Sequence, residues 1–280
     1  MKLQYLPLLG IVLLMNACMW GVPKSKSPSI AQDTLTYKYD TIKERASDCG
    51  TKPDSGCTIA KITYPFFDKR PTINDSVIYK LDLFLEPAKS SPLLNYLIFS
   101  DFKSDTNLKQ IASQFMSIYK KDKLKGNLDN SIYNMDLHSK IIRQDSSILT
   151  LEFDEYIFLG GAHGISSTYF INWNTKTNKP IYLADILSNG YQTKLTAIAD
   201  SIFRKSENLS DSTSLKTNYF FKNGVFSLNN NYLITPLGIR FLYNEYEIKP
   251  YAAGQTNLLI PYAKIKLLLL PHTVVSQYLK

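Results

Sequence analysis

The sequence predicts an α+β fold, with a largely antiparallel sheet, helices packed on it and two subdomains. Apolar–polar alternation typical of strands dominates residues 131–173, and amphipathic helical periodicity marks residues 107–121 and 191–205. Strands and helices do not alternate regularly, as they would in a parallel βαβ fold. With 280 residues, 44% of them hydrophobic, the chain is long enough to bury a substantial core.

The N-terminus has the features of a lipoprotein signal peptide over residues 1–17. Lys2 precedes an apolar run, Leu6–Met15, that is shorter than the roughly 20 residues needed to cross a bilayer. The run ends in Asn16-Ala17-Cys18, which is similar to a bacterial lipobox with Cys18 as the lipidated first residue. The alternative is a plain secretory signal in which Cys18 is incidental. Residues 18–33 are rich in Ser, Pro and Lys, as in a flexible tether.

These features predict a membrane-anchored lipoprotein of the cell envelope. No acidic run follows Cys18, so we expect the periplasm-facing side of the outer membrane. The net charge of +8, or +7 without Lys2 of the predicted signal peptide, suits anionic glycans or lipid headgroups, although an ordinary solvated surface is the default explanation. We expect no nucleic-acid partner and no cofactor, because the chain carries no motif for either.

The first half begins with a predicted hairpin. Residues 35–46 and 58–67 have strand composition, and Pro65 marks the second strand as an edge or an end. Cys49 and Cys57 bracket the turn-rich loop between them. In an oxidising compartment a disulfide is the expected pairing, and the rival metal site lacks further Cys or His ligands nearby.

Two helices follow in the first half. Residues 73–85 fit helix and strand periodicity alike, and Pro71-Thr72 favours a helix entrance. Residues 107–121 place Leu108, Ile111 and Phe115 on one stripe. We place a seam near Gly126–Asn130, between an N-terminal module (34–130) and a C-terminal domain (131–280).

The second half is predicted to be mainly β structure. The expected strands are 131–143, 147–159, 168–173, 181–183, 220–221, 225–228, 232–235 and 237–243, with a polar turn at 174–179. Helices are expected at 191–205 and at 262–270, the latter between Pro261 and Pro271.

The clearest candidate site is the turn Gly160-Gly161-Ala162-His163-Gly164, which follows a strand containing Tyr156. Its glycines permit positive φ, so backbone N–H groups and the imidazole could bind an anionic or carbonyl group. The alternative is a tight turn in which His163 only orders the loop. One histidine makes no metal site by itself, so none is predicted.

Asp154 and Glu155 before this turn could act with His163 as acid and base. Successive strand residues point to opposite faces, however, so both serve one pocket only if a bulge intervenes. Charged residues facing water are the default reading. No nucleophile elbow or phosphate-binding loop is present in the sequence, and no catalytic residue is assigned.

Three segments together resemble a known bacterial family: the turn at 160–164, Asn172–Leu187, and Tyr246–Gly254 followed by Leu258–Tyr262. They are similar to the extracytoplasmic domain of RsiV-like lysozyme-sensing anti-sigma factors. Residues from about 34 to 145 resemble, less specifically, the N-terminal module of PdaC-type peptidoglycan deacetylases. The resemblance implies a two-part α+β ectodomain that binds cell-wall ligands or lysozyme-like proteins. The anti-sigma segment and membrane-spanning helix of those regulators have no counterpart here.

Tyr246 and Tyr251 lie in the last of these segments, in an aromatic corner. Such rings stack on sugars or protein partners, or they pack a turn against a sheet. The expected function is a non-catalytic, lipid-anchored binding protein for peptidoglycan or a lysozyme-like protein. Its predicted binding residues are Tyr156, Gly160, Gly161, His163, Gly164, Tyr246 and Tyr251. The alternatives are a cell-wall hydrolase or deacetylase using Asp154, Glu155 and His163, and a component of a larger envelope assembly.

Overall fold

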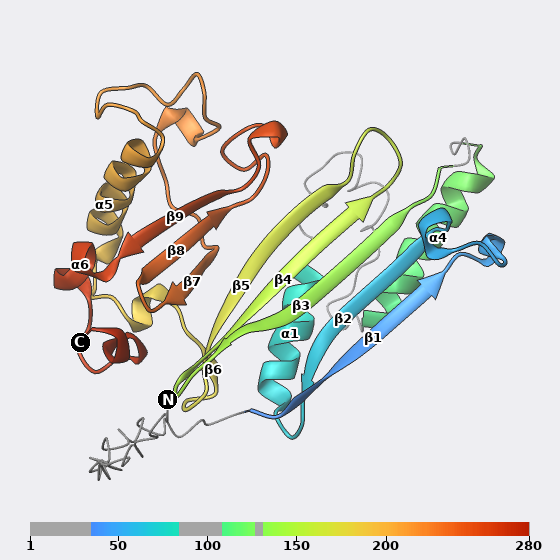
Figure 1. Ribbon diagram of the computed structural model, residues 1–280, viewed down its shortest axis with the longest axis horizontal. Coiled ribbons are helices and arrows are strands. Elements are labelled where there is room, and N and C mark those ends of the chain that lie inside the picture. Colours follow the sequence, from blue (N-terminus) through green and yellow to red (C-terminus); the bar gives the residue numbers. More distant parts are fainter. Residues whose placement is uncertain (1–34, 84–107, 127–130, 280) are drawn as a thin grey trace, which may run out of the picture. The chain divides into compact units, whose positions relative to one another are not determined.

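The computed structural model describes residues 35–83, 108–126 and 131–279, which lie in one compact unit, residues 32–280. The predicted signal peptide, tether and lipidated Cys18 fall outside the described residues. Within them the α+β prediction is confirmed: six strands form one sheet, three form a second, and four α-helices accompany them (Figure 1). No helix in the described ranges is both long and apolar enough to span a membrane.

The six-stranded sheet has the order β1-β2-β3-β4-β5-β6, and all neighbours are antiparallel except β2 and β3. The second sheet has the order β7-β8-β9 and is fully antiparallel. In chain order the elements are β1 (Tyr37–Arg45), β2 (Ile59–Phe67), α1 (Pro71–Leu83), α4 (Leu108–Leu124), β3 (Asn134–Gln144), β4 (Ile148–Phe158), β5 (Ile165–Asn174), β6 (Lys179–Pro180), α5 (Tyr191–Ser206), β7 (Tyr232–Thr235), β8 (Gly238–Tyr243), β9 (Thr256–Pro261) and α6 (Tyr262–Ile265).

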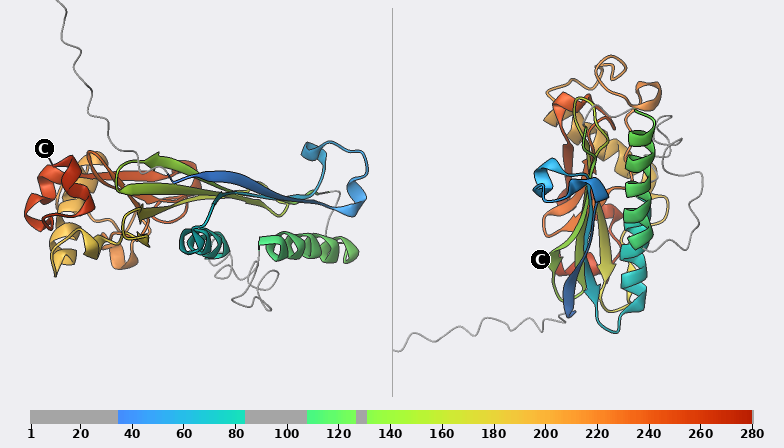
Figure 2. Two further views of the ribbon diagram at one scale, coloured as in Figure 1. Left: turned by 90° about the horizontal axis from the view of Figure 1, so that it is seen from below. Right: turned by 90° about the vertical axis from the view of Figure 1, so that its right-hand side faces the viewer.

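Helices α1 and α4 cover the same face of the six-stranded sheet (Figure 2). Alternate residues of a strand share a face, so Leu149, Leu151 and Phe153 of β4 all point into the core beneath these helices. The helices contribute Val77, Phe115 and other apolar residues to the same core, as the predicted stripe of α4 requires. The helical reading of 73–85 is therefore right for the described part, since α1 begins at Pro71.

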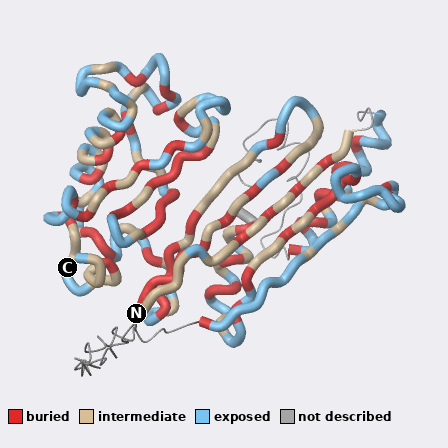
Figure 3. Tube along the Cα trace, viewed as in Figure 1, coloured by how far each residue is buried: buried red, intermediate tan, exposed pale blue. Residues whose placement is uncertain are grey.

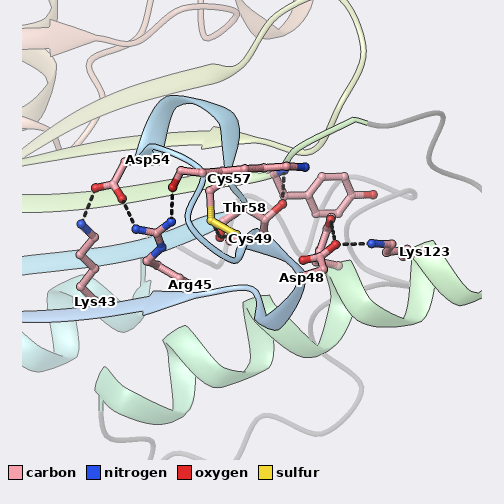
Figure 4. Close-up of a disulfide and its surroundings, with 11 residues drawn as sticks. Lys43, Arg45, Asp48, Cys49, Asp54, Cys57, Thr58 and Lys123 are labelled. Carbon is pink, nitrogen blue, oxygen red and sulfur yellow. Dashed lines mark hydrogen bonds and ion pairs between the residues drawn. A yellow bond between two sulfur atoms is a disulfide. The ribbon is translucent and has the colours of Figure 1, made fainter.

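The predicted disulfide hairpin is confirmed. β1 pairs with β2, and Cys49 and Cys57 are bonded with their Cα atoms 5.4 Å apart (Figure 4). Arg45 donates to Asp54 and to the Lys52 carbonyl, at 3.0 and 2.5 Å, so it ties the loop back to β1.

Pro65 lies beyond the β2–β3 pairing, which ends at Thr63. It therefore sits where β2 has only β1 as a neighbour and a missing N–H costs little. The edge strand itself is β1, which is exposed along most of its length (Figure 3).

The second core lies between the small sheet and α5. Phe203 of α5 is surrounded by Tyr219, Phe221 and Phe226, with ring centroids 5.2 to 5.5 Å away. The predicted strands at 220–221 and 225–228 are wrong: these residues are irregular and flank a 3₁₀ turn, Lys222–Gly224. Their apolar pattern reflects rings packed on Phe203 and not strand pairing.

Three further elements differ from the predictions. Residues 181–183 form no strand, since β6 ends at Pro180, and a 3₁₀ turn occupies Leu183–Asp185. The last helix stops at Ile265 and continues only as a 3₁₀ turn to Leu268. β9 was not expected as a strand. Backbone contacts accompany these differences: the Ile181 amide donates to the Asn172 carbonyl, the Leu270 amide donates to the Ile186 carbonyl, and β9 pairs with β8.

Asparagine side chains join the second sheet to the edge of β5, along the part of that edge that β6 leaves unpaired. Asn231 accepts from the Phe170 amide and donates to the Thr168 carbonyl, at 3.2 and 2.7 Å. Asn244 accepts from the Thr168 amide at 2.8 Å. In the opposite direction, the Asn172 side chain of β5 bonds to β7: it donates to the Tyr232 carbonyl at 3.0 Å and accepts from the Ile234 amide at 2.9 Å.

These amides replace the backbone ladder that another full-length strand would supply. The large sheet contains strands from both sides of the predicted seam at Gly126–Asn130. The boundary between the two apolar cores lies instead at the start of β4, where Ile148 belongs to the second core and Leu149 to the first. The division at 130 stays a prediction about independently folding units.

Candidate ligand-binding site at the glycine–histidine turn

The turn between β4 and β5 owes its course to two glycines. Gly160 and Gly161 have φ values of 80° and 95°, in a region that residues with a Cβ rarely enter. The chain can therefore reverse tightly and present the next residues, Ala162 and His163, to solvent. Both glycines have the positive φ that the sequence allows, and their role in ligand binding stays a prediction.

Gly164 serves another purpose, because its φ is not positive. A Cβ added there would lie 2.4 Å from a ring atom of Tyr156, so only a glycine lets that ring cross the start of β5. The Tyr156 side chain remains 40% exposed. Gly164 thus fixes the position of an exposed tyrosine beside the turn.

His163 meets the aromatic corner that the sequence predicts more than 80 residues later. Its ring centroid lies 4.2 Å from that of Tyr251, with the planes 15° apart, and 6.4 Å from that of Tyr246. The two tyrosine centroids are 5.6 Å apart. All three residues are exposed, so we call this surface the histidine–tyrosine cluster.

The hydrogen bond of His163 determines which ring nitrogen carries the proton. Nδ1 lies 2.9 Å from the carbonyl oxygen of Gly164. Because a carbonyl oxygen only accepts, Nδ1 carries the proton and donates it, which leaves Nε2 as an acceptor when the ring is neutral. The cluster therefore offers a ligand two phenol hydroxyls, an imidazole nitrogen and aromatic surface.

Tyr246 is held in a conformation that tyrosine seldom adopts. Its φ is 64°, the left-handed region, which costs of order 1 kcal/mol for a residue with a Cβ. The neighbouring turn holds it there, since the Glu247 carboxylate accepts from the Asn244 amide and from the Asn229 side chain, at 2.8 and 2.7 Å. Backbone strain maintained at an exposed aromatic side chain is typical of binding sites.

The acid–base alternative lacks the required geometry. Asp154 pairs with His138 and Thr168, and Glu155 with Leu137 and Ser167, without a bulge, so their side chains lie on opposite faces of the sheet. Asp154 faces away from the helices, where Lys140 pairs with it at 3.0 Å.

The prediction that Glu155 faces water is wrong. This residue is not a solvent-facing charge: only 8% of it is exposed, on the core face. Burial raises the pKa of its carboxyl to about 8. The neighbouring Tyr169 hydroxyl has its pKa raised to about 12, mainly because Tyr169 is itself buried and to a smaller extent because of the negative charge of ionised Glu155. The alternation of β4 already indicates this burial, because Glu155 falls in register with Leu151 and Phe153 on the apolar face of the strand.

No cluster of three His, Cys, Asp or Glu side chains suitable for a metal ion occurs in the part of the chain that the structure describes.

Comparison with known proteins identifies two regions. Residues 51–166 match the family described as "Deacetylase PdaC", and residues 184–263 match the "Protein of unknown function (DUF3298)". The chain contains a DUF3298/PdaC-like module. The whole glycine–histidine turn falls in the PdaC-like region, and both tyrosines of the cluster fall in the DUF3298 region.

One curated relative is also similar in sequence. Over 178 residues, 62% of this chain, the sequence is 23% identical to the peptidoglycan-N-acetylmuramic acid deacetylase PdaC of Bacillus subtilis. The match spans only 38% of that enzyme.

DUF3298 family proteins from Bacteroides fragilis and Pseudomonas aeruginosa share the fold of the module, with TM-scores of 0.61 and 0.60 and 19% identity each. The superpositions cover 88% and 86% of this chain, and 98% and 96% of those chains. At this identity the likeness concerns the fold alone.

Proposed function

We propose that this protein is a non-catalytic binding module of the cell envelope that recognises peptidoglycan through the histidine–tyrosine cluster. The observation that carries the proposal is the contact of His163 with Tyr251, centroids 4.2 Å apart, which joins two exposed motifs into one aromatic surface. Aromatic rings bordered by hydroxyl and imidazole groups suit the apolar faces and hydroxyls of sugars. The PdaC relative, whose name refers to peptidoglycan, supports this ligand class.

Binding is favoured over the hydrolase or deacetylase alternative by the contacts of the residues that such an enzyme would need. Thr168 donates to Asp154 at 2.9 Å and Lys140 pairs with the same carboxylate. Glu155 lies on the opposite face, buried. Nδ1 of His163 already donates to Gly164, so Asp154 cannot orient the ring through that nitrogen.

Co-sedimentation with insoluble peptidoglycan tests the proposal. Wild-type protein should pellet, and Tyr251→Ala should shift at least half of it to the supernatant under the same conditions. Tyr37→Ala is the matched control, because Tyr37 is a similarly exposed aromatic residue on β1. Retention that is equal in Tyr251→Ala and wild type would refute the assignment of the site.

A parallel arm uses immobilised lysozyme, since the sequence resemblance also implies lysozyme-like partners. Capture by lysozyme and not by peptidoglycan, abolished in Tyr251→Ala, would keep the site and replace the ligand class. Release of acetate or of cleaved glycan by wild-type protein, lost in His163→Ala, would instead establish the enzymatic alternative.

The lipid anchor is part of the proposal and has a separate test. Cells supplied with an alkyne-bearing fatty acid should incorporate the label into this protein through Cys18. Cys18→Ala should abolish the label and release the protein from the membrane fraction. Labelling that persists in Cys18→Ala would contradict the lipoprotein assignment.

A further inference from the structure

A separate cavity of about 510 Å³ opens beside β5, between α1 and the turn that follows β6. This volume lies within the roughly 300–1,000 Å³ typical of small-molecule sites. None of its lining residues belongs to the histidine–tyrosine cluster.

The walls are rich in tyrosine. Tyr79 and Tyr182 border the cavity with 63% and 64% of their surface exposed, while Tyr232 forms a buried wall and Tyr191 also contributes to the lining. Tyrosines around a shallow cavity supply aromatic faces for sugar C–H groups and hydroxyls for sugar oxygens.

The buried walls are fixed before any ligand arrives. The Tyr232 hydroxyl donates to the Ile181 carbonyl at 3.2 Å, and Asn172 is hydrogen-bonded on both sides to β7. A preformed cavity avoids the entropy cost of ordering its walls on binding.

Lys80 of α1 also lines the cavity and is the one basic residue among its described lining residues. Its Nζ lies 5.2 Å from the centroid of the Tyr169 ring, and burial lowers the pKa of this ammonium. No carboxylate in the described ranges forms an ion pair with it, in contrast to Lys140 and Lys249, which pair with Glu152 and Glu207. Partial desolvation without an anionic partner is unfavourable, and a bound anion would relieve it.

We propose that this cavity binds a sugar that carries a carboxylate, with the pyranose ring between Tyr79 and Tyr182 and the carboxylate on Lys80. Glu155, the carboxyl near Tyr169, does not neutralise Lys80 at neutral pH, since it is predominantly protonated there. The site is independent of the histidine–tyrosine cluster and of the function proposed for it.

Two sugars that differ by a single lactyl group, which carries the carboxylate, make the test sharp. N-acetylmuramic acid is N-acetylglucosamine with a lactyl carboxylate added, so each is titrated into ¹⁵N-labelled protein and followed by NMR. N-acetylmuramic acid should shift resonances of residues around 79–80 and 180–184, and it should bind at least tenfold more tightly than the neutral sugar.

Lys80→Gln should weaken binding of N-acetylmuramic acid roughly tenfold, as loss of a charge-assisted hydrogen bond does, and leave the neutral sugar unaffected. Lys38→Gln is the matched control, because Lys38 also lies over an aromatic ring, 5.8 Å from the Phe66 centroid, on the distant β1 strand. It should bind as wild type does.

Tyr182→Ala provides a second variant that does not endanger the fold, since the side chain is largely exposed. It should weaken binding of both sugars, whereas His163→Ala should weaken neither at this site. Equal affinity for the acidic and neutral sugars, absence of shifts around 79–80, or wild-type affinity in Lys80→Gln would each overturn the proposal.

Discussion

Glu155 is a carboxyl whose burial has a measurable cost. Its pKa of about 8 in the folded protein lies above the ordinary value of roughly 4.3 expected in the unfolded chain. Between these values the folded state holds a proton that the unfolded state has lost. Stability must therefore fall as the pH rises through this window.

We predict that Glu155→Gln removes this loss. The free energy of unfolding of the wild type should drop by roughly 2–4 kcal/mol from pH 5 to pH 8 through this residue alone, and the variant should lack that drop. Urea denaturation at several pH values measures it. Asp211→Asn, at an exposed position, should keep the wild-type slope, and an unchanged slope in Glu155→Gln would refute the burial argument.

Gly238 illustrates a glycine required by close backbone approach. A Cβ built there would lie 2.1 Å from the carbonyl oxygen of Ile260 on β9. Backbone of a paired strand cannot move aside as a side chain can, so β8 and β9 would have to separate.

Gly238→Ala should therefore destabilise the protein by about 2–4 kcal/mol. Gly254→Ala is the control: Gly254 also has positive φ, 64°, but nothing lies within 4 Å of its added Cβ, so about 1 kcal/mol is expected. Thermal unfolding of the two variants compares them. Equal losses would mean that backbone conformation and not the Ile260 contact governs Gly238.

At the scale of elements, the join between β5 and the second sheet depends on side chains in place of a ladder. Asn231→Ala would leave the Phe170 amide without its side-chain acceptor and would remove one of two donors to the Thr168 carbonyl, which also accepts from Asn244 at 3.1 Å. An unsatisfied buried group costs about 1–3 kcal/mol, so a loss of about that size is expected. Asn257→Ala, at an exposed position of β9, should cost less than about 0.5 kcal/mol. Urea midpoints decide between them, and a neutral Asn231→Ala would contradict the role given to the bridge.

The disulfide loop permits a second test at this scale. Cys49 and Cys57 are separated by 8 residues, a loop whose closure stabilises by about 2.5 kcal/mol in the chain-entropy description. The double variant Cys49→Ala/Cys57→Ala should lose about that amount in urea denaturation, and wild type under reducing conditions should match it. Wild-type stability in both would show that the β1–β2 hairpin does not need the bond.

The elements that were predictable are those whose environment repeats locally. The apolar alternation of β4 and the apolar stripe of α4 each identify the face that packs into a single core, and the structure confirms both. The asparagine bridge was not predictable from the sequence, because asparagine is most typical of turns. Asn172 and Asn231 bridge the two sheets only because the fold places Asn172 beside Tyr232 and Asn231 beside Phe170. The segments around Phe221 failed for the same reason: packing on Phe203 imitates a strand pattern.

At the scale of the whole molecule, the candidate site combines parts from both matched regions. Tyr246 and Tyr251 lie at one end of the second sheet, and His163 lies at the β4–β5 turn of the first. The sequence indicated each motif separately, but only the fold places them in contact. Neither matched region alone contains the cluster.

An NMR titration of residues 32–280 with soluble peptidoglycan fragments tests the central claim most directly. The account predicts shifts in the amides of residues 160–164 and 246–251, with the fragments recovered chemically unchanged after prolonged incubation. Conversion of the fragments by the protein, or the absence of any perturbation at both segments, would contradict it.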